Sequence, residues 1–201
     1  MTELLGKSTV KRRKAAQALQ RVPQAGACKD LQAAIELEAD SNNWMTMVEL
    51  LRALAAQQCG SAADMVWQRF INGAEAHSMV SMAAATAYIR LSRKNLQDAS
   101  AVLKLLEHPG YSVKEGALEA LAYDRMIPDR TSQAKIIEMC FDMGSNRERG
   151  YTDPRYGLAA ACAGWEPEVT ERFLNHCIAS DDAPLAHVAK NSLKGKYVRL
   201  R

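Results

Sequence analysis

Residues 97–126 have the sequence QDASAVLKLLEHPGYSVKEGALEALAYDRM, which predicts two helices joined by a tight turn. In the first half, apolar residues recur at the spacing of one helix face, until Pro109 and Gly110 interrupt the backbone hydrogen-bond ladder. Ser112 and Glu115 then form a capping-box pattern at the start of a second amphipathic helix. Because one hairpin cannot cover both of its apolar faces, we expect neighbouring hairpins to stack on it.

Similar helix pairs are predicted along most of the chain, with helices over residues 30–39, 61–71 and 167–179 among them. When the second helices are aligned, equivalent small or apolar residues are separated by 34, 33, 41 and 31 positions. These residues are Leu50, Ala84, Ala117, Leu158 and Ala189, and we expect all five to be buried. No segment alternates polar and apolar residues with the period of two that is typical of strands. A hairpin repeated at this spacing is typical of an α-solenoid.

HEAT repeats are the family that two of these pairs resemble, SAVLKLLEHPGYSVKEGALEALA (100–122) and TERFLNHCIASDDAPLAHVAKNSL (170–193). Each has an amphipathic first helix, a short turn with Pro or Asp, and a second helix with small residues at its centre. The resemblance covers about residues 30–195 and implies an all-α fold, a right-handed α-α superhelix of about five helical hairpins, HEAT-like or armadillo-like. Residues 1–29 would form a basic N-terminal cap helix and residues 196–201 a basic C-terminal tail.

Composition limits the class of protein. Of the 201 residues, 48% are hydrophobic and 24% are charged, which is typical of an ordinary folded chain. No apolar run approaches the length that spans a membrane, and the basic cluster at 11–14 is not followed by the apolar segment of a secretory signal. These observations predict a cytoplasmic protein without a membrane partner.

The five cysteines are odd in number and have no repeated spacing. The sequence therefore predicts buried free thiols in a reducing cytosol, with neither a metal site nor a cofactor. The cysteines are Cys28, Cys59, Cys140, Cys162 and Cys177.

Charge is distributed unevenly, with +6 over residues 1–29, −8 over 30–182 and +5 over 183–201. The basic ends are either solvated terminal helices or contacts for nucleic acid or an acidic partner. For nucleic acid, the candidate residues are Lys11, Arg12, Arg13 and Lys14.

The segment GSNRERGYTDPRYG, residues 144–157, is the irregular part of the repeat pattern. Its Arg147, Arg149, Tyr151 and Arg155 would suit an acidic protein partner, since arginine forks onto carboxylates and irregular loops on rigid scaffolds often carry function. The alternative is a neutral surface insertion.

The HEAT resemblance adds one further candidate. In HEAT-like arrays the second helices line the concave, ligand-binding face, and many repeats place a basic residue there. Lys114 and Arg155 match that position.

Catalytic patterns are weak. His176 and Cys177 are neighbours in sequence, so a helix would point them about 100° apart. The segment SNNWMTMVELL (41–51) is similar in its Trp44 to HEAT-like alkylpurine DNA glycosylases, which use a Trp-x-x-x-Asp arrangement. Here Trp44 is followed by Val48 at the Asp position, and Glu49 lies one residue out of phase.

The function predicted from these observations is non-catalytic protein binding through the concave face and the 144–157 loop. Such a protein would be an adaptor or an inhibitor, and a bacterial, toxin-neutralising immunity protein is one class that fits. The alternative is a HEAT-like nucleic-acid-binding protein related to the alkylpurine DNA glycosylases.

Overall fold

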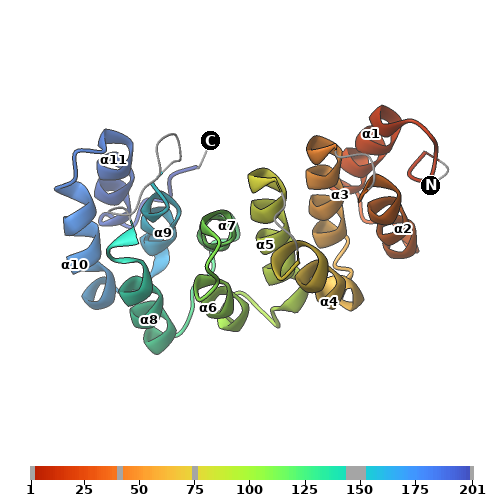
Figure 1. Cartoon of the computed structure of the whole chain (residues 1–201). Helices are drawn as coiled ribbons and strands as arrows, with labels where there is room; N and C mark the ends of the chain where they lie inside the picture. The colour runs from red at the N-terminus through yellow and green to blue at the C-terminus, as the bar shows by residue number, and fades with distance from the viewer. Residues whose placement is uncertain (1–2, 40–42, 74–76, 144–152, 200–201) are drawn as a thin grey trace. The chain divides into compact units, whose positions relative to one another are not determined.

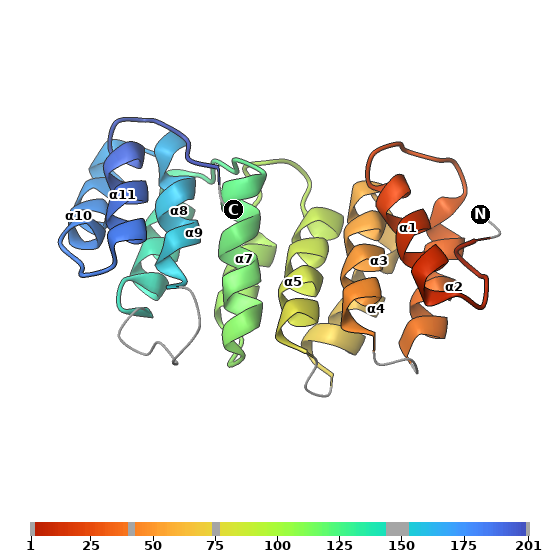
Figure 2. The same ribbon diagram turned by 90° about the horizontal axis from the view of Figure 1, so that it is seen from above.

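A computed structural model describes residues 3–39, 43–73, 77–143 and 153–199 (Figures 1 and 2). Every regular element in these ranges is helical, which confirms the predicted all-α class. The chain divides into two compact units, Met1–Ser92 and Arg93–Arg201, and each is described by itself. The boundary between them falls inside the repeat domain predicted for residues 30–195.

The first unit is built around α3, which packs against α1 on one side and α5 on the other, so that these three helices form a row (Figure 2). Two further helices pack on this row, α2 on α3 and α4 on α5. The elements are α1 (Thr9–Leu19), α2 (Ala27–Ala39), α3 (Trp44–Ala56), η1 (Gly60–Ala62), α4 (Ala63–Val66), η2 (Trp67–Ile71) and α5 (Ser78–Ser92). The helix expected over 61–71 is therefore a short α-helix between a 3-10 turn and a π-helical turn.

In the second unit, α7, α9 and α11 form one row, and α8 packs between α6 and α10 in another. Helix α6 also packs on α7, and α10 packs on α11. The elements are α6 (Ser100–Leu106), α7 (Tyr111–Tyr123), α8 (Arg130–Cys140), α9 (Arg155–Ala161), η4 (Cys162–Gly164), α10 (Pro167–Ile178) and α11 (Ala183–Ser192).

The aligned positions of the repeat are all in the core. Leu50, Ala84, Ala117, Leu158 and Ala189 are each 0% exposed, as predicted, and they lie on α3, α5, α7, α9 and α11. Small residues let the rows pack closely. A Cβ added to Gly157 would lie 3.0 Å from the backbone carbon of Leu118, so α9 approaches the backbone of α7 itself.

The predicted capping box at Ser112 is wrong. Helix α7 begins at Tyr111, with Gly110 as an N-cap that offers no side-chain cap. His108 takes part in the turn instead, because its Nδ1 accepts a hydrogen bond from the Gly110 N–H at 2.9 Å. The turn closes before Ser112, which therefore lies inside the helix.

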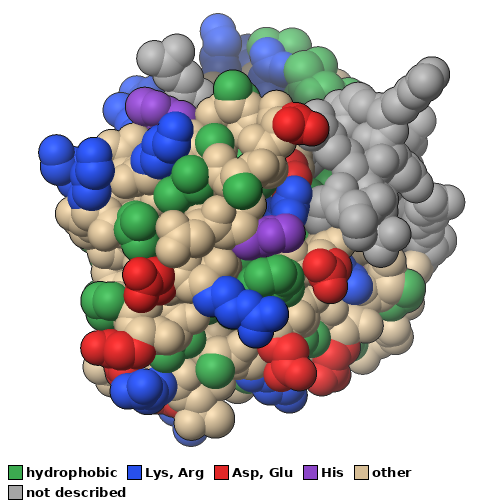
Figure 3. Space-filling view, turned by 90° about the vertical axis from the view of Figure 1, so that its left-hand side faces the viewer, with side chains coloured by type: hydrophobic (Ala, Val, Ile, Leu, Met, Phe, Trp, Pro, Cys, Tyr) green, Lys and Arg blue, Asp and Glu red, His purple; other side chains and the backbone are tan. Residues whose placement is uncertain are grey.

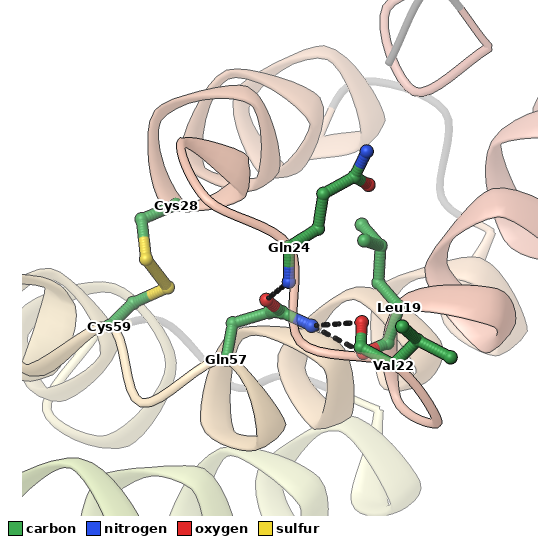
Figure 4. Close-up of a disulfide and its surroundings, with 6 residues drawn as sticks. All are labelled: Leu19, Val22, Gln24, Cys28, Gln57 and Cys59. Atoms are coloured by element: carbon green, nitrogen blue, oxygen red, sulfur yellow. Dashed lines mark hydrogen bonds between the residues drawn. A yellow bond between two sulfur atoms is a disulfide. The ribbon is translucent and has the colours of Figure 1, made fainter.

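The prediction of five free thiols is wrong for two of them. Cys28, at the start of α2, forms a disulfide with Cys59, which directly precedes η1 (Figure 4). Packing of α2 on α3 brings the two Cα atoms to 5.5 Å, although 31 residues separate them in sequence. The other three cysteines are free and buried, as predicted.

Candidate functional site

The first unit exposes a cluster of large side chains where α3 begins. Trp44, Met45 and Met79 are 38%, 43% and 37% exposed, whereas most large apolar side chains of this unit are buried. Together with Arg13 and His77 they form a group that we call the Trp44 cluster.

Three contacts join this cluster across three segments, two of them between side chains and one to the backbone of Met79. The rings of Trp44 and His77 stack in parallel, with centroids 4.6 Å apart and an interplanar angle of 0°. On the α1 side, Nη1 of Arg13 lies 3.6 Å from the sulfur of Met45. Nδ1 of His77 accepts a hydrogen bond from the Met79 N–H at 3.3 Å. The cluster therefore links α1, α3 and the start of α5.

The local sequence explains why Met45 is exposed. Asn43 caps α3 by accepting a hydrogen bond from the Thr46 N–H at 3.1 Å, so Met45 lies in the first turn. The buried side of the helix is already filled by Leu50 and its neighbours, which leaves Met45 on the opposite side.

Helix α1, which supplies Arg13 to the cluster, is basic. Helix α1 contains no acidic residue, and its Lys11 and Lys14 are exposed. Arg13 makes no ion pair within the described residues. Arg12 is different, because it is only 5% exposed and its Nε contacts a carboxylate oxygen of Glu38 at 2.6 Å. Of the four residues predicted for nucleic acid, Arg12 is thus part of the core of the first unit.

No protein-family model matches the chain, and a comparison with curated proteins gives no match either. Among the described helices, none is both long and apolar enough to cross a membrane. In the same part of the chain, no three His, Cys, Asp or Glu side chains are placed to hold a metal ion together.

The partner-binding residues predicted from the 144–157 loop are mostly outside the described residues. This applies to Arg147, Arg149 and Tyr151. Lys114 is half-buried on α7.

Arg155 lies in the core of the second unit, where a surface position was expected. It is 9% exposed, and its Nη2 donates to Oδ2 of the buried Asp153 at 2.7 Å. This hydrogen bond raises the pKa of Arg155 above its ordinary value. Nη1 of Arg155 also lies 3.2 Å from Nε2 of His176.

The residues considered for catalysis face different surroundings. Cys177 is fully buried, while His176 is exposed and stacks on Phe141 with centroids 4.7 Å apart. Figure 3 shows the adjoining face of the second unit, where basic, acidic, histidine and hydrophobic side chains are interspersed. Burial raises the pKa of Cys177 to about 12, so its thiol stays protonated at neutral pH.

The side chains around Trp44 differ from the Trp-x-x-x-Asp arrangement of the glycosylases. Oε2 of Glu49 accepts a hydrogen bond from Nε2 of Gln20 at 2.6 Å, which holds this carboxylate against α1. Val48 is buried, and the Trp44 ring is stacked on His77. Neither Glu49 nor Val48 therefore places a carboxylate beside Trp44.

Sequence reasoning missed two features, the Trp44 cluster in the first unit and a perturbed carboxyl group in the second. The Trp44 cluster depends on contacts between helices that no local pattern reports, although the Trp44-Met45 pair after Asn43 is a visible signal of apolar residues in a first helical turn. The second feature is Glu115 on α7, whose pKa is raised to about 7 by burial and by the nearby Glu119.

Proposed function

We propose that the chain is a HEAT-like α-solenoid that binds a protein partner without catalysing a reaction, as an adaptor or an inhibitor. The observation that supports this most is the Trp44 cluster, which exposes one aromatic and two methionine side chains next to an arginine. Trp and Arg are enriched among the residues that dominate binding energy at protein interfaces, and Met is enriched in interfaces generally. Large apolar side chains gathered on a surface mark such interaction sites.

The arrangement of helices within each unit supports the solenoid. In the second unit, α7, α9 and α11 form one row and α6, α8 and α10 another, and α6 packs on α7 as α10 packs on α11. In the first unit, α2 with α3 and α4 with α5 form similar helix pairs, and α1 extends the row of α3 and α5. Arrays of this kind present extended surfaces along a row of helices, which suits recognition of a protein.

The protonation of the free thiols favours binding over nucleophilic catalysis. Burial raises the pKa of Cys140 and Cys177 to about 12 and that of Cys162 well above its ordinary value. The thiolate is the nucleophilic form of cysteine, so these three side chains are inert at neutral pH.

The test is capture of the partner with matched variants. The tagged chain is incubated with nuclease-treated extract of its own cells, the captured proteins are identified, and each purified candidate is titrated by calorimetry. We expect Trp44→Ala with Met45→Ala to weaken binding by roughly thirtyfold or more, since loss of an interface anchor costs about 2 kcal/mol. A Val22→Ala, Leu37→Ala control also removes exposed apolar side chains of the first unit and should bind like wild type. Equal affinity in both variants would contradict the proposal.

A second candidate function is nucleic-acid binding, which the basic and acid-free helix α1 favours. Three of its side chains, Lys11, Arg13 and Lys14, are at least partly exposed. Phosphate contacts by such residues give an affinity that falls steeply with salt, which is the property that distinguishes this candidate.

A further inference from the structure

We propose, resting on the protein-binding function above, that the Trp44 cluster recognises an acidic segment of the partner. In this complex, large apolar side chains of the segment cover Trp44 and Met45, and a carboxylate beside them pairs with Arg13. The partner is thus defined by two adjacent features, an apolar anchor and an acidic flank.

The apolar half of the site combines a fixed ring with adaptable neighbours. The parallel stack on His77 fixes the orientation of the Trp44 ring, so little freedom remains to be lost when a partner binds. Met45 and Met79 have long, unbranched and polarisable side chains that adjust to the shape of an apolar ligand. Methionine has neither a positive charge nor a hydrogen-bond donor for a phosphate group, and this favours a protein segment over a nucleic acid.

The basic half of the site is Arg13, whose guanidinium has a weak partner. Its Nη1 contacts the sulfur of Met45 at 3.6 Å, and a thioether sulfur is a poor hydrogen-bond acceptor. A carboxylate would accept charge-assisted hydrogen bonds from the same guanidinium, and these are about twice as strong as neutral ones. Arg13 therefore reaches its full bonding capacity only with an anion placed next to Met45.

Two carboxylates of the first unit, on α2 and α3, are already bonded within the chain, whereas Asp40 and Glu75 lie outside the described residues. Glu38 is 1% exposed and bonded to Arg12, and Glu49 bonds to Gln20 and pairs with Arg52 at 3.5 Å. The exposed Lys11 and Lys14 on α1 add positive charge. This charge complementarity selects an acidic segment over a neutral or basic one.

The experiment is selection from a displayed random-peptide library on the immobilised full chain. Wild type should enrich peptides in which large apolar residues stand next to Asp or Glu. The Arg13→Glu variant should bind these peptides at least tenfold more weakly and enrich Lys or Arg at the same positions. Arg21→Glu makes the same charge change about two turns further along the chain and should keep the acidic preference. Thermal melting of each variant verifies folding.

The remaining outcomes separate the two proposals. Enrichment of apolar peptides without an acidic bias, or an equal loss of that bias in Arg13→Glu and Arg21→Glu, overturns the acidic segment and leaves protein binding in place. If wild type enriches nothing beyond what the Trp44→Ala, Met45→Ala variant enriches, protein binding at this cluster itself fails. If an oligonucleotide of about 20 nucleotides binds wild type but not Arg13→Glu at physiological salt, the ligand of this cluster is a nucleic acid and not an acidic protein segment.

Discussion

At the scale of single residues, Glu115 shows how burial changes the chemistry of a carboxyl group. Burial and the nearby Glu119 raise its pKa from 4.5 to about 7. The unfolded chain releases this proton at lower pH than the folded chain does, so Glu115 subtracts stability increasingly as pH rises from 4.5 to about 7. The sequence predicted Glu115 as part of a capping box from its spacing to Ser112. Its raised pKa could not be predicted in this way, because it depends on how α7 packs in the folded chain.

We therefore expect Glu115→Gln to raise the melting temperature above pH 7 and to leave it nearly unchanged below pH 4.5, where the wild-type carboxyl is already neutral. Melting curves of both proteins across this pH range measure the difference. Glu171→Gln, at an exposed position on α10, is the control and should melt like wild type at every pH. A gain that is independent of pH would refute the assigned cause.

At the scale of elements, periodicity was enough to predict where most helices lie. The helix expected over 30–39 is α2 (Ala27–Ala39), and the one over 167–179 is α10 (Pro167–Ile178). Sequence did not predict the Cys28–Cys59 disulfide, because the pairing arises only when α2 and α3 pack together. The disulfide and the predicted cytoplasmic location point in opposite directions, since cytosolic thiols are kept reduced. The oxidation state of protein taken from its own cells decides between them.

The disulfide should stabilise the first unit. Closing a loop of this length restricts the unfolded chain and is worth about 4 kcal/mol. We expect Cys28→Ser with Cys59→Ser to lower the free energy of unfolding of the first unit by up to that amount, measured by urea denaturation. Reducing agent should have the same effect on wild type and none on the double variant. Unchanged stability on reduction would show that the disulfide contributes nothing.

Under native conditions, an alkylating reagent should leave Cys140, Cys162 and Cys177 unmodified, because they are buried and protonated.

Another prediction at the element scale concerns the contact of α9 with α7. Gly157→Val would press a branched side chain onto the backbone of Leu118 and Glu119, which cannot move without shifting α7. We expect a loss of about 1–3 kcal/mol in the free energy of unfolding, the usual cost of overpacking. At Gly60 the nearest neighbour of an added Cβ is 3.6 Å away, so Gly60→Val is a control that should cost much less. Similar losses in the two variants would mean that close packing at Gly157 is not the cause.

At the scale of the whole molecule, composition and repeat spacing predicted an all-α chain, whereas the proposed binding function depends on which charged surface contacts a partner. Two basic ends are at least partly exposed, with Lys11, Arg13 and Lys14 near one terminus and Lys190, Lys194 and Lys196 near the other. Exposed apolar side chains lie near both ends, those of the Trp44 cluster near the first and those of Leu193 and Tyr197 near the second.

We expect wild type to bind DNA or RNA weakly at low salt and to lose this binding at physiological salt, since contacts with phosphates alone are driven by counterion release. Changing Lys11, Arg13 and Lys14 to Glu should weaken the low-salt binding about as much as changing Lys190, Lys194 and Lys196 to Glu, because each triple variant makes the same change in charge. Arg12 stays unchanged, so that its pair with Glu38 is kept. Fluorescence anisotropy of a labelled oligonucleotide over a salt series measures both effects. If binding persists at physiological salt and only the first triple variant abolishes it, α1 is a nucleic-acid site, and the Trp44 ring beside it becomes a platform on which a base stacks.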